Sequence, residues 1–305
     1  MNINKKIILL TGSTGFLGSH LLSYLISQNK YYIICLKRSF SNMDRIKNIE
    51  SVNLKYFDLD KDNIENIFQK FHINIILHTA TQYGRDNESV YKVLNANLMF
   101  PIEIIDLAIK YNVKCFINTD SFFNKPNFSY SHLLDYSLSK KSLLIWMKHL
   151  QNKISFCNVI LEHIYGENDN PQKFVENVIQ SIAFSTNEIL NLTHGHQRRD
   201  FIYIKDVVFA YEKIIDYCIN EDFSYKTFEV GRGESEEVGD FVKTVKNLSN
   251  SSIYLNFGAV PYFSDEIMES KANIGELTKL GWLPKYSIQD GIKLILDHYI
   301  KHRSA

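Results

Sequence analysis

The stretch from residue 7 to residue 28 constrains the fold of this chain more than any other. An apolar run over residues 7–11 leads directly into three glycines at three-residue spacing, Gly12, Gly15 and Gly18. An amphipathic segment follows at once and extends to residue 28. An apolar run, a glycine-rich turn and a helical periodicity in this order predict a strand, a tight turn and a helix.

A strand, turn and helix with this glycine spacing are typical of dinucleotide-binding sites. Gly12 would allow the sharp turn, Gly15 would let the backbone approach a pyrophosphate, and Gly18 would let the helix pack closely on the strand. The helix N-terminus would offer N–H groups and its positive end to the phosphates. A glycine-rich turn without a ligand is the alternative reading, because such a motif alone is weak. The cofactor contacts expected from this loop are Gly12, Thr14, Gly15, Phe16, Leu17 and Gly18.

The first half of the chain alternates short apolar runs with segments of helical periodicity. The expected strands are residues 7–11, 32–37, 54–57, 75–78, 115–119 and 155–161, and the expected helices are 16–28, 63–71, 88–111 and 136–150. This alternation predicts an α/β fold, a Rossmann-type doubly wound parallel sheet with helices on both faces. Pro101 should kink or split the third helix. The alternation loosens later, so we expect a dinucleotide-binding domain over residues 1–165, with returns near 200–231, and a smaller, mostly C-terminal substrate domain over 166–305.

Composition excludes several classes of function. The chain has 305 residues and a formal net charge of zero, so no basic field argues for a nucleic-acid partner. No apolar run reaches membrane-spanning length, so no membrane partner is expected. The N-terminus has no long apolar region or small-residue cleavage site, and the four cysteines are scattered. We therefore expect a cytoplasmic protein with unpaired thiols and no metal site.

The end of the second expected strand bears on the choice of cofactor. An Asp or Glu there, about 20 residues after the glycines, would bind the ribose 2′-hydroxyl of NAD. This chain has Lys37 and Arg38 instead, and two cations suit the 2′-phosphate of NADP. Solvated surface cations are the alternative, and NAD stays the less favoured cofactor. Asp58 and Leu59, after the third strand, are placed to contact the adenine, although Asp58 would equally serve as a polar strand-end cap.

The fourth expected strand ends in small residues that a cofactor could cross. Thr79, Ala80 and Thr81 would let the diphosphate and ribose pass over the strand end. Asn97 lies on the helix before Pro101, where its amide would bond backbone carbonyls of a neighbouring strand or order a water near the cofactor. We therefore expect a largely architectural role for Asn97 in the cofactor site.

Tyr136 and Lys140 form the catalytic pair that the sequence predicts. Their i, i+4 spacing places both side chains on one face of a helix, one turn apart. An ammonium near a phenol would lower the phenol's pKa, so Tyr136 could exchange a proton with a substrate oxygen near neutral pH. The preceding strand runs into Asn118-Thr119-Asp120-Ser121, whose hydroxyls would reach the same oxygen. A Tyr–Lys pair at this spacing also occurs by chance, but here it follows the glycine motif in the right order.

These motifs together resemble the extended short-chain dehydrogenases/reductases that act on nucleoside-diphosphate sugars. The resemblance covers nearly the whole chain, and it is closest to the CDP-abequose synthase group, which uses NADPH to reduce the C4 ketone of a CDP-3,6-dideoxyhexose, a surface-polysaccharide precursor. Besides the glycines and the Tyr–Lys pair, the motifs are Ile-Asn-Thr-Asp-Ser-Phe-Phe at 117–123, Leu-Glu-His-Ile-Tyr-Gly at 161–166, Gln-Arg-Arg-Asp-Phe-Ile-Tyr at 197–203, Asn-Phe-Gly-Ala at 256–259, Asp-Glu-Ile-Met at 265–268 and Leu-Gly-Trp at 280–282.

The resemblance implies roles for individual residues. Tyr136 would donate a proton to the C4 oxygen, Lys140 would hold the nicotinamide ribose, and Thr119 would hydrogen-bond the same oxygen as Tyr136. Arg199 would grip the substrate diphosphate, unless it pairs with Asp200 or Asp206. The remaining expected contacts are His163 for the cofactor and Tyr83, Asp120, Ser121, Lys173 and Phe174 for the substrate.

Three kinds of function follow from this resemblance. The favoured one is an NADPH-dependent 4-keto reductase of a nucleoside-diphosphate sugar, with CDP favoured by the resemblance alone. A 4-epimerase or C4 dehydrogenase with bound NAD is the second, and a non-catalytic dinucleotide-binding protein is a remote third. Dehydratases carry Thr-Asp-Glu where this chain has Thr-Asp-Ser at 119–121, which disfavours dehydration. Apolar residues over more than one face of helices 88–111 and 136–150 suit a homodimer.

Overall fold

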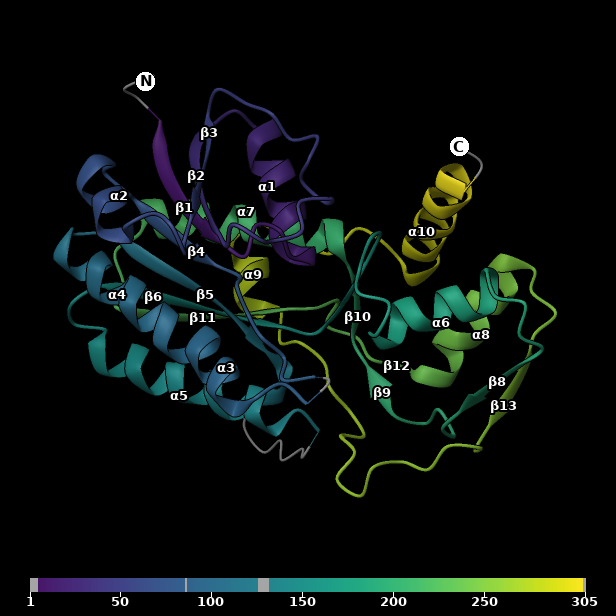
Figure 1. Ribbon diagram of the computed structural model, residues 1–305. Coiled ribbons are helices and arrows are strands. Elements are labelled where there is room, and N and C mark those ends of the chain that lie inside the picture. Colours follow the sequence, from purple (N-terminus) through teal and green to yellow (C-terminus); the bar gives the residue numbers. More distant parts are fainter. Residues whose placement is uncertain (1–4, 86, 126–131, 304–305) are drawn as a thin grey trace. The chain divides into compact units, whose positions relative to one another are not determined.

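The protein is described by a computed structural model covering residues 5–85, 87–125 and 132–303 (Figure 1). These residues group into two compact units. The first contains residues up to 125, 132–160 and 210–228, and the second contains 161–209 and 229–303. The division expected from the sequence placed the boundary at residue 165 and the returning segment near 200–231. In the described ranges, no helix combines the length and the apolar character needed to cross a membrane.

A seven-stranded sheet forms the centre of the first unit. Its order is β11-β6-β5-β4-β1-β2-β3, and the pairs β3–β2, β2–β1, β1–β4 and β4–β5 are parallel. The strand order reverses between β1 and β4, which is the switch point at which such sheets bind ligands. This confirms the doubly wound fold. The strands are β1 (Lys6–Thr11), β2 (Tyr31–Lys37), β3 (Leu54–Asp58), β4 (Ile75–His78), β5 (Cys115–Ser121), β6 (Ser155–Leu161) and β11 (Tyr225–Val230).

Helices cover both faces of this sheet. On one face, α2 (Ile64–Lys70), α4 (Phe100–Lys110) and α5 (Leu134–Leu150) bury their apolar sides in a common core, to which Phe116 of β5 and Leu143 of α5 contribute. On the other face, α1 (Phe16–Ser27) and α7 (Ile204–Asn220) are tied together by the Tyr24 hydroxyl, which donates to Glu212 at 2.6 Å. Burial of these apolar side chains supplies the main stabilising term.

The long helical pattern over residues 88–111 is split into three pieces, as Pro101 predicts. They are α3 (Val90–Leu94), a π-helical turn, η1 (Asn95–Met99), and α4, in whose first turn Pro101 lies. Proline has no backbone N–H to donate to the preceding turn. The N–H of Phe100 instead reaches back five residues to the carbonyl of Asn95. This wider turn contains Asn97.

The second unit contains three small two-stranded sheets and a group of helices. Its aromatic core includes Phe201 and Phe241, whose rings stack with centroids 4.2 Å apart. Strands β7 and β10 pair in parallel, β9 and β12 are antiparallel, and β8 and β13 are parallel. The elements are β7 (His163–Tyr165), α6 (Phe174–Ala183), β8 (Ile189–Leu192), β9 (Arg198–Arg199), β10 (Phe201–Tyr203), β12 (Glu236–Glu237), α8 (Val238–Ser249), β13 (Tyr254–Phe257), α9 (Gly275–Lys279) and α10 (Ile288–Arg303).

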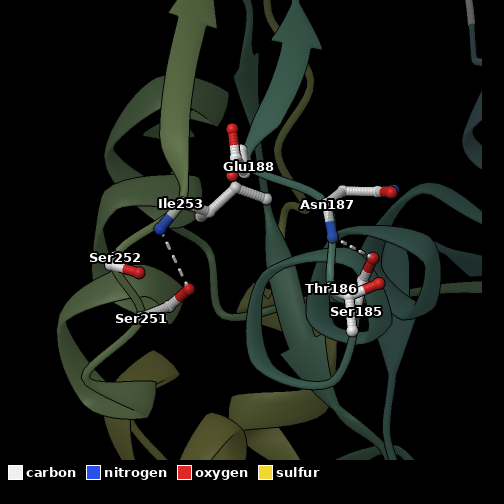
Figure 2. Close-up of a pocket in the computed structure, with 7 residues that line it drawn as sticks. All are labelled: Ser185, Thr186, Asn187, Glu188, Ser251, Ser252 and Ile253. Carbon is white, nitrogen blue, oxygen red and sulfur yellow. Dashed lines mark hydrogen bonds between the residues drawn. The ribbon is translucent and has the colours of Figure 1, made fainter.

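A hollow of about 440 Å³ lies where the segments leading into β8 and β13 meet (Figure 2). Its polar side chains bond their own turns. The Ser185 hydroxyl accepts the Asn187 N–H at 3.0 Å, and the Ser251 hydroxyl accepts the Ile253 N–H at 3.3 Å. The lining residues are Ser185, Thr186, Asn187, Glu188, Ser251, Ser252 and Ile253, none of which the sequence analysis placed in a site.

Candidate active site

The glycine loop after β1 is packed too tightly for larger residues at two positions. Gly12 has a φ of +75°, and a Cβ there would lie 2.5 Å from the backbone nitrogen of Ala80. A Cβ on Gly18 would overlap the carbonyl oxygen of Gly12. Gly15 is different, because its Cβ would meet only that same oxygen, at 3.2 Å. Packing therefore explains why positions 12 and 18 hold glycine. Packing does not explain Gly15, which stays the position where a pyrophosphate is expected to approach the backbone.

The N-terminus of α1 is open to an anion. Its N-cap is Gly15, and within the described part of the chain no side chain caps it and no acidic residue lies in its first turn. Phe16 and Leu17, the first helical residues, are themselves buried. The backbone N–H groups and the positive end of the helix dipole are thus left to a ligand phosphate. The loop residue Arg45, which the sequence analysis did not single out, donates to the Thr14 carbonyl at 3.3 Å.

The end of β4 lies against this loop. The Thr79 hydroxyl donates to the Thr11 carbonyl at 2.7 Å, and the Ala80 N–H donates to the Thr11 hydroxyl at 3.4 Å. His78 is fully buried, and burial, with a smaller effect of Lys140, holds its pKa well below the usual range. Its Nδ1 lies 2.8 Å from the Thr11 hydroxyl. His78 is therefore a packed strand residue beside the expected cofactor path.

Two of the residues expected around the adenosine are paired with each other. The Lys37 ammonium at the end of β2 forms an ion pair with the Asp58 carboxylate at the end of β3. Arg38 is exposed, and its guanidinium lies over the Phe40 ring, 4.9 Å from the centroid. Leu59 packs against the hydrophobic core that the sheet shares with α2, α4 and α5. The pairing means that Asp58 neutralises one of the two cations proposed for a 2′-phosphate and leaves Arg38 as the exposed one.

Tyr136 and Lys140 occupy one buried face of α5. The exposed fraction of Tyr136 is 5% and that of Lys140 is 2%. The ring of Tyr83 stacks on Tyr136, and the ring of Phe123 meets it edge-on with centroids 6.4 Å apart. The Lys140 ammonium donates to the Thr119 carbonyl at 2.8 Å. The helix therefore holds the pair as the spacing predicts, with the phenol between two aromatic rings.

The protonation behaviour of this pair differs from the expectation. Burial raises the pKa of Tyr136 well above its usual range, Tyr83 and Asp120 act in the same direction, and hydrogen bonds with Ser121 and Thr81 oppose them. Burial lowers the pKa of Lys140 to about 8, against an opposing effect of the Asp120 carboxylate. Desolvation of the phenol dominates, and the ammonium is directed at the Thr119 carbonyl. Tyr136 is thus held as a neutral proton donor.

Tyr136 interacts with the hydroxyls of Ser121 and Thr81, whereas the Thr119 hydroxyl has another partner. Ser121 hydrogen-bonds with Tyr136, whereas the Thr119 hydroxyl lies 2.7 Å from the hydroxyl of Tyr211 on α7. β5 continues two residues further than predicted, to Ser121. The contact predicted between the Thr119 hydroxyl and the substrate oxygen stays a prediction.

Asp120 also has contacts that differ from the expected ones. Its carboxylate is 2% exposed, and its two oxygens accept amide N–H groups from Asn124 at 2.7 Å and Asn158 at 3.0 Å. The Asn158 carbonyl oxygen in turn accepts from Asn118 at 2.8 Å. The strand thus directs this carboxylate into a buried set of amides, and the substrate contact predicted for Asp120 stays a prediction.

Asn97 has the architectural contacts that the sequence predicts. Its amide accepts the Gln82 N–H at 2.8 Å and donates to the Gln82 carbonyl at 2.7 Å. It also donates to the Ser139 hydroxyl at 3.0 Å, and its oxygen accepts from Thr81 at 3.2 Å. Asn97 thereby joins the segment after β4, the π-helical turn and α5, and it fixes the position of Thr81 near Tyr136.

In the second unit, Arg199 forms an ion pair with Glu266. It is buried in β9, and its guanidinium also donates to the Arg198 carbonyl at 2.9 Å. Neither aspartate considered as its partner has that role. Asp200 accepts the N–H groups of Arg232, Gly233 and Ala272, and Asp206 accepts those of Lys285 and Tyr286. Burial raises the pKa of Asp200 to about 6.

Three more of the expected site residues also lie in the second unit. His163 is on β7 with its ring edge-on to Phe201, 5.9 Å between centroids. Lys173 precedes α6 and pairs with Asp169 at 2.9 Å. Phe174, the first residue of α6, is 41% exposed. Their predicted cofactor and substrate contacts stay predictions, as does the diphosphate contact of Arg199.

Comparison with known proteins agrees with this geometry. The NAD dependent epimerase/dehydratase family matches residues 8–231, which is more than half of the chain. The chain belongs to this family. It is 38% identical over 302 residues to the CDP-abequose synthase of Salmonella muenchen, covering 97% of this chain and 99% of the relative. The corresponding protein of Salmonella typhimurium is 34% identical over 304 residues, covering 97% of this chain and 99% of the relative.

The solved structures of the epimerase/dehydratase fold include close matches in shape. The UDP-glucose 4-epimerase of Thermotoga maritima superposes with a TM-score of 0.83 at 20% identity, covering 97% of this chain and 99% of that one. At this identity the likeness shows the fold. Among residues 5–85, 87–125 and 132–303, no group of three His, Cys, Asp or Glu side chains is arranged to hold a metal ion.

Sequence reasoning missed several residues in this epimerase/dehydratase site. Ser121 is not among them, because the sequence analysis already named it as a substrate contact. Glu266 lies in the 265–268 motif quoted for the resemblance, but nothing local links it to Arg199. Asn124 and Asn158 had no sequence signal at all, since an isolated asparagine has many possible roles.

Proposed function

We propose that this protein is an NADPH-dependent reductase of the C4 ketone of a nucleoside-diphosphate (deoxy)hexose. The main support is the site around Tyr136, where a buried phenol lies against the rings of Tyr83 and Phe123, one helical turn from the buried Lys140. A phenol that keeps its proton at neutral pH suits a general acid, which protonates the carbonyl oxygen during reduction. Two full-length CDP-abequose synthase relatives favour the same chemistry and a CDP-linked sugar.

The residues of the first unit fit a dinucleotide. The open N-terminus of α1 and the tight turn at Gly12 would hold the pyrophosphate, and Lys140 would hold the nicotinamide ribose. The reduced nicotinamide would supply a hydride to C4. Tyr136 would give its proton to the C4 oxygen, and Ser121 would hydrogen-bond this oxygen and orient the ketone. Arg199 would bind the diphosphate of the substrate, a task that suits a guanidinium.

Dehydration is disfavoured by the residues at 119–121. Dehydratases of this family carry Thr-Asp-Glu, whereas this chain has Thr-Asp-Ser at these positions. The Ser121 hydroxyl cannot replace a carboxylate as a base. Asp120 does not compensate, since both of its oxygens are bound to amides.

Preference for NADPH is supported by charge at the adenosine end of the site. Arg38 is exposed at the end of β2, and Arg45 contacts the glycine loop through the Thr14 carbonyl. Both cations would attract a 2′-phosphate. The acidic residue that would bind a free 2′-hydroxyl is replaced at this position by Lys37, which pairs with Asp58.

A homodimer is supported by an apolar surface on α3, η1 and α5. Large side chains there are exposed in the single chain, including Tyr91 at 75% and Ile145 at 69%. The others are Val90, Leu94, Met99, Leu134, Leu138 and Trp146. A contiguous patch of this kind is typical of an interface between subunits. A second copy of the chain would cover it by packing the same helices against each other.

The experiment is NADPH consumption with a panel of nucleoside-diphosphate 4-keto sugars, with CDP-4-keto-3,6-dideoxyhexose first. Equal loss of NADPH and ketone would support the reductase, and the fastest nucleotide would identify the base. No consumption with any member would refute it. The purified protein would then be tested for tightly bound NAD and for epimerisation or oxidation of the corresponding alcohols. A binding protein without turnover would show cofactor binding but no dependence on Tyr136.

A further inference from the structure

A row of buried polar side chains crosses the ends of three neighbouring strands in the first unit. Thr11 at the end of β1 is paired in register with His78 of β4, and His78 is paired in register with Asn118 of β5. Residues paired in this way project to the same side of a sheet. All three side chains are fully buried. The row therefore lies inside the protein and runs from the start of the glycine loop to the strand that ends at Ser121.

Thr11 and His78 determine each other's hydrogen positions. The Thr11 hydroxyl accepts the Ala80 N–H at 3.4 Å, and its oxygen lies 2.8 Å from the Nδ1 of His78. Among the described residues, no other group accepts the hydrogen of the Thr11 hydroxyl. His78 is neutral, because burial holds its pKa well below the usual range, and a neutral imidazole has a single N–H. With Nδ1 as an acceptor, that hydrogen is on Nε2.

Asn118 and Asn158 form the other end of the row. The Asn118 amide donates to the Asn158 amide oxygen at 2.8 Å, and the Asn158 amide donates to the Asp120 carboxylate at 3.0 Å. A carboxylate only accepts, so the Asn158 nitrogen faces Asp120 and the Asn158 oxygen faces the Asn118 nitrogen. Asn158 is on β6, and β5 lies between β6 and β4. The Asn118 oxygen is therefore directed away from β6, to the side where β4 carries His78.

The two atoms at which these halves of the row meet have no partner. His78 Nε2 and Asn118 Oδ1 are both buried, and neither has a hydrogen-bond partner in the described part of the chain. One is an N–H donor and the other is a carbonyl acceptor, on residues paired across β4 and β5. Leaving a buried donor and a buried acceptor unpaired costs stability. A molecule that accepts one hydrogen and donates another would satisfy both atoms.

The surroundings of His78 favour water as this molecule. The His78 ring contacts the rings of Phe116 and Phe100, with centroids 5.5 and 6.1 Å apart. These apolar rings have no polar hydrogen to give to the Asn118 oxygen. Buried waters bridge polar groups that otherwise lack partners, and they make about two to four hydrogen bonds each. A molecule held between two fully buried side chains is an internal one.

We propose that one internal water molecule bridges His78 Nε2 and Asn118 Oδ1. The water accepts the hydrogen of Nε2 and donates one of its own to Oδ1. The hydrogen bonds then follow one direction, from the Ala80 N–H beyond β4 to the Asp120 carboxylate. Hydrogen bonds aligned in this way polarise and strengthen one another. This water site depends on neither the proposed substrate nor the proposed reaction.

The water site keeps the start of the glycine loop in place. Because Nε2 gives its hydrogen to the water, Nδ1 remains an acceptor for Thr11. The Thr11 hydroxyl stays directed at His78 and keeps a lone pair for the Ala80 N–H. Gly12 follows Thr11 directly, and a Cβ at Gly12 would lie 2.5 Å from the nitrogen of Ala80. The row thus connects the turn that is expected to hold a pyrophosphate with β5.

The direct test is a crystal structure of the wild-type protein at a resolution that shows ordered water. We expect a solvent peak about 2.7–3.2 Å from both His78 Nε2 and Asn118 Oδ1. A direct hydrogen bond between Nε2 and Oδ1 would overturn the proposal, and so would a map with no peak between these atoms. This measurement needs no substitution, so it does not depend on whether a variant folds.

The position of the His78 hydrogen is tested by long-range ¹H–¹⁵N NMR of protein labelled with ¹⁵N-histidine, with the signals assigned by His78→Phe. We expect the Nε2–H form near neutral pH. The Nδ1–H form would contradict the proposed direction of the hydrogen bonds, since Nε2 would then have no hydrogen to give to the water.

Asn118→Leu removes the acceptor of the water's hydrogen. We expect the solvent peak to be lost and the Nε2 resonance of His78 to shift. Tyr56→Phe is the matched control, because the Tyr56 hydroxyl on β3 is another buried oxygen of this sheet without a partner among the described residues. It should leave the peak and the His78 resonances unchanged. If Asn118→Leu is unfolded by circular dichroism, His78→Phe keeps an aromatic ring and should also lose the peak. An unchanged peak in a folded variant of either residue would refute the water site.

Discussion

The ring of Tyr83 lies on the ring of Tyr136, with centroids 4.9 Å apart and an angle of 27° between their planes. Tyr83 comes from the segment after β4, and Tyr136 comes from the first turn of α5. Burial raises the pKa of Tyr136, and Tyr83 adds to this shift. A residue far away in sequence thus changes the pKa of the predicted catalytic tyrosine.

Replacing Tyr136 by Phe tests this role. The variant keeps the aromatic packing but has no proton to give, so we expect kcat to fall by about 10²–10⁴-fold, as for loss of a general acid. NADPH affinity should change little, because the hydroxyl is the only group removed. Steady-state kinetics on the accepted 4-keto sugar, with NADPH fluorescence titration alongside, measure both quantities. Turnover at the wild-type rate would remove Tyr136 from the mechanism.

Ser121 and Thr119 should respond differently to loss of their hydroxyls. Ser121→Ala removes the hydrogen bond at Tyr136, so kcat should fall by about tenfold or more, with little change in stability. Thr119→Val removes the bond to Tyr211 and leaves a buried hydroxyl without that partner. We expect it to lower the free energy of unfolding by about 1–3 kcal/mol, with a smaller effect on kcat. Urea unfolding and kinetics of the two variants distinguish these outcomes, and the reverse pattern would restore Thr119 as the reacting hydroxyl.

Alanine substitutions in the glycine loop should separate packing from ligand approach. A Cβ on Gly18 overlaps the Gly12 carbonyl oxygen, so Gly18→Ala should lower the free energy of unfolding by about 1–3 kcal/mol. Gly15→Ala meets a single atom at 3.2 Å and should fold nearly as the wild type does. It should nevertheless bind NADPH more weakly, since its methyl group projects toward the pyrophosphate position. Equal NADPH affinity of Gly15→Ala and wild type would contradict the proposed cofactor path.

Asp200 should make the second unit less stable as the pH rises. Burial raises its pKa to about 6 in the folded state, above the usual value of 3.8, so the folded protein binds more protons between these pH values. Its contribution is therefore fully present below about pH 4 and is lost as the pH rises through 6. The difference in free energy of unfolding between wild type and Asp200→Asn should change by at most about 1.4 kcal/mol per pH unit in this window. A difference that is independent of pH from 4 to 7 would show that Asp200 titrates normally.

The periodicity of the sequence was sufficient to predict most of the strands and helices of the first unit. The glycine spacing and the alternation of apolar runs with helical segments predicted the doubly wound parallel sheet, and Pro101 predicted the split of the long helix, because each depends on local patterns. The backbone contacts of Asn97 and the placement of Tyr136 and Lys140 on one helix also agree with expectation. Strand ends were less accurate, since β5 runs two residues beyond its expected end, to Ser121.

The sequence by itself determined the fold class and the two residues most central to the proposed chemistry, Tyr136 and Lys140. Spacing along a strand or a helix decides which side chains share a face, so these features can be derived without long-range contacts. Only the tertiary structure decided their electrostatics, namely the stacking of Tyr83, the amides around Asp120 and the pairing of Lys37 with Asp58. Burial and charge depend on segments that are distant in sequence, and desolvation is therefore a property of the folded protein.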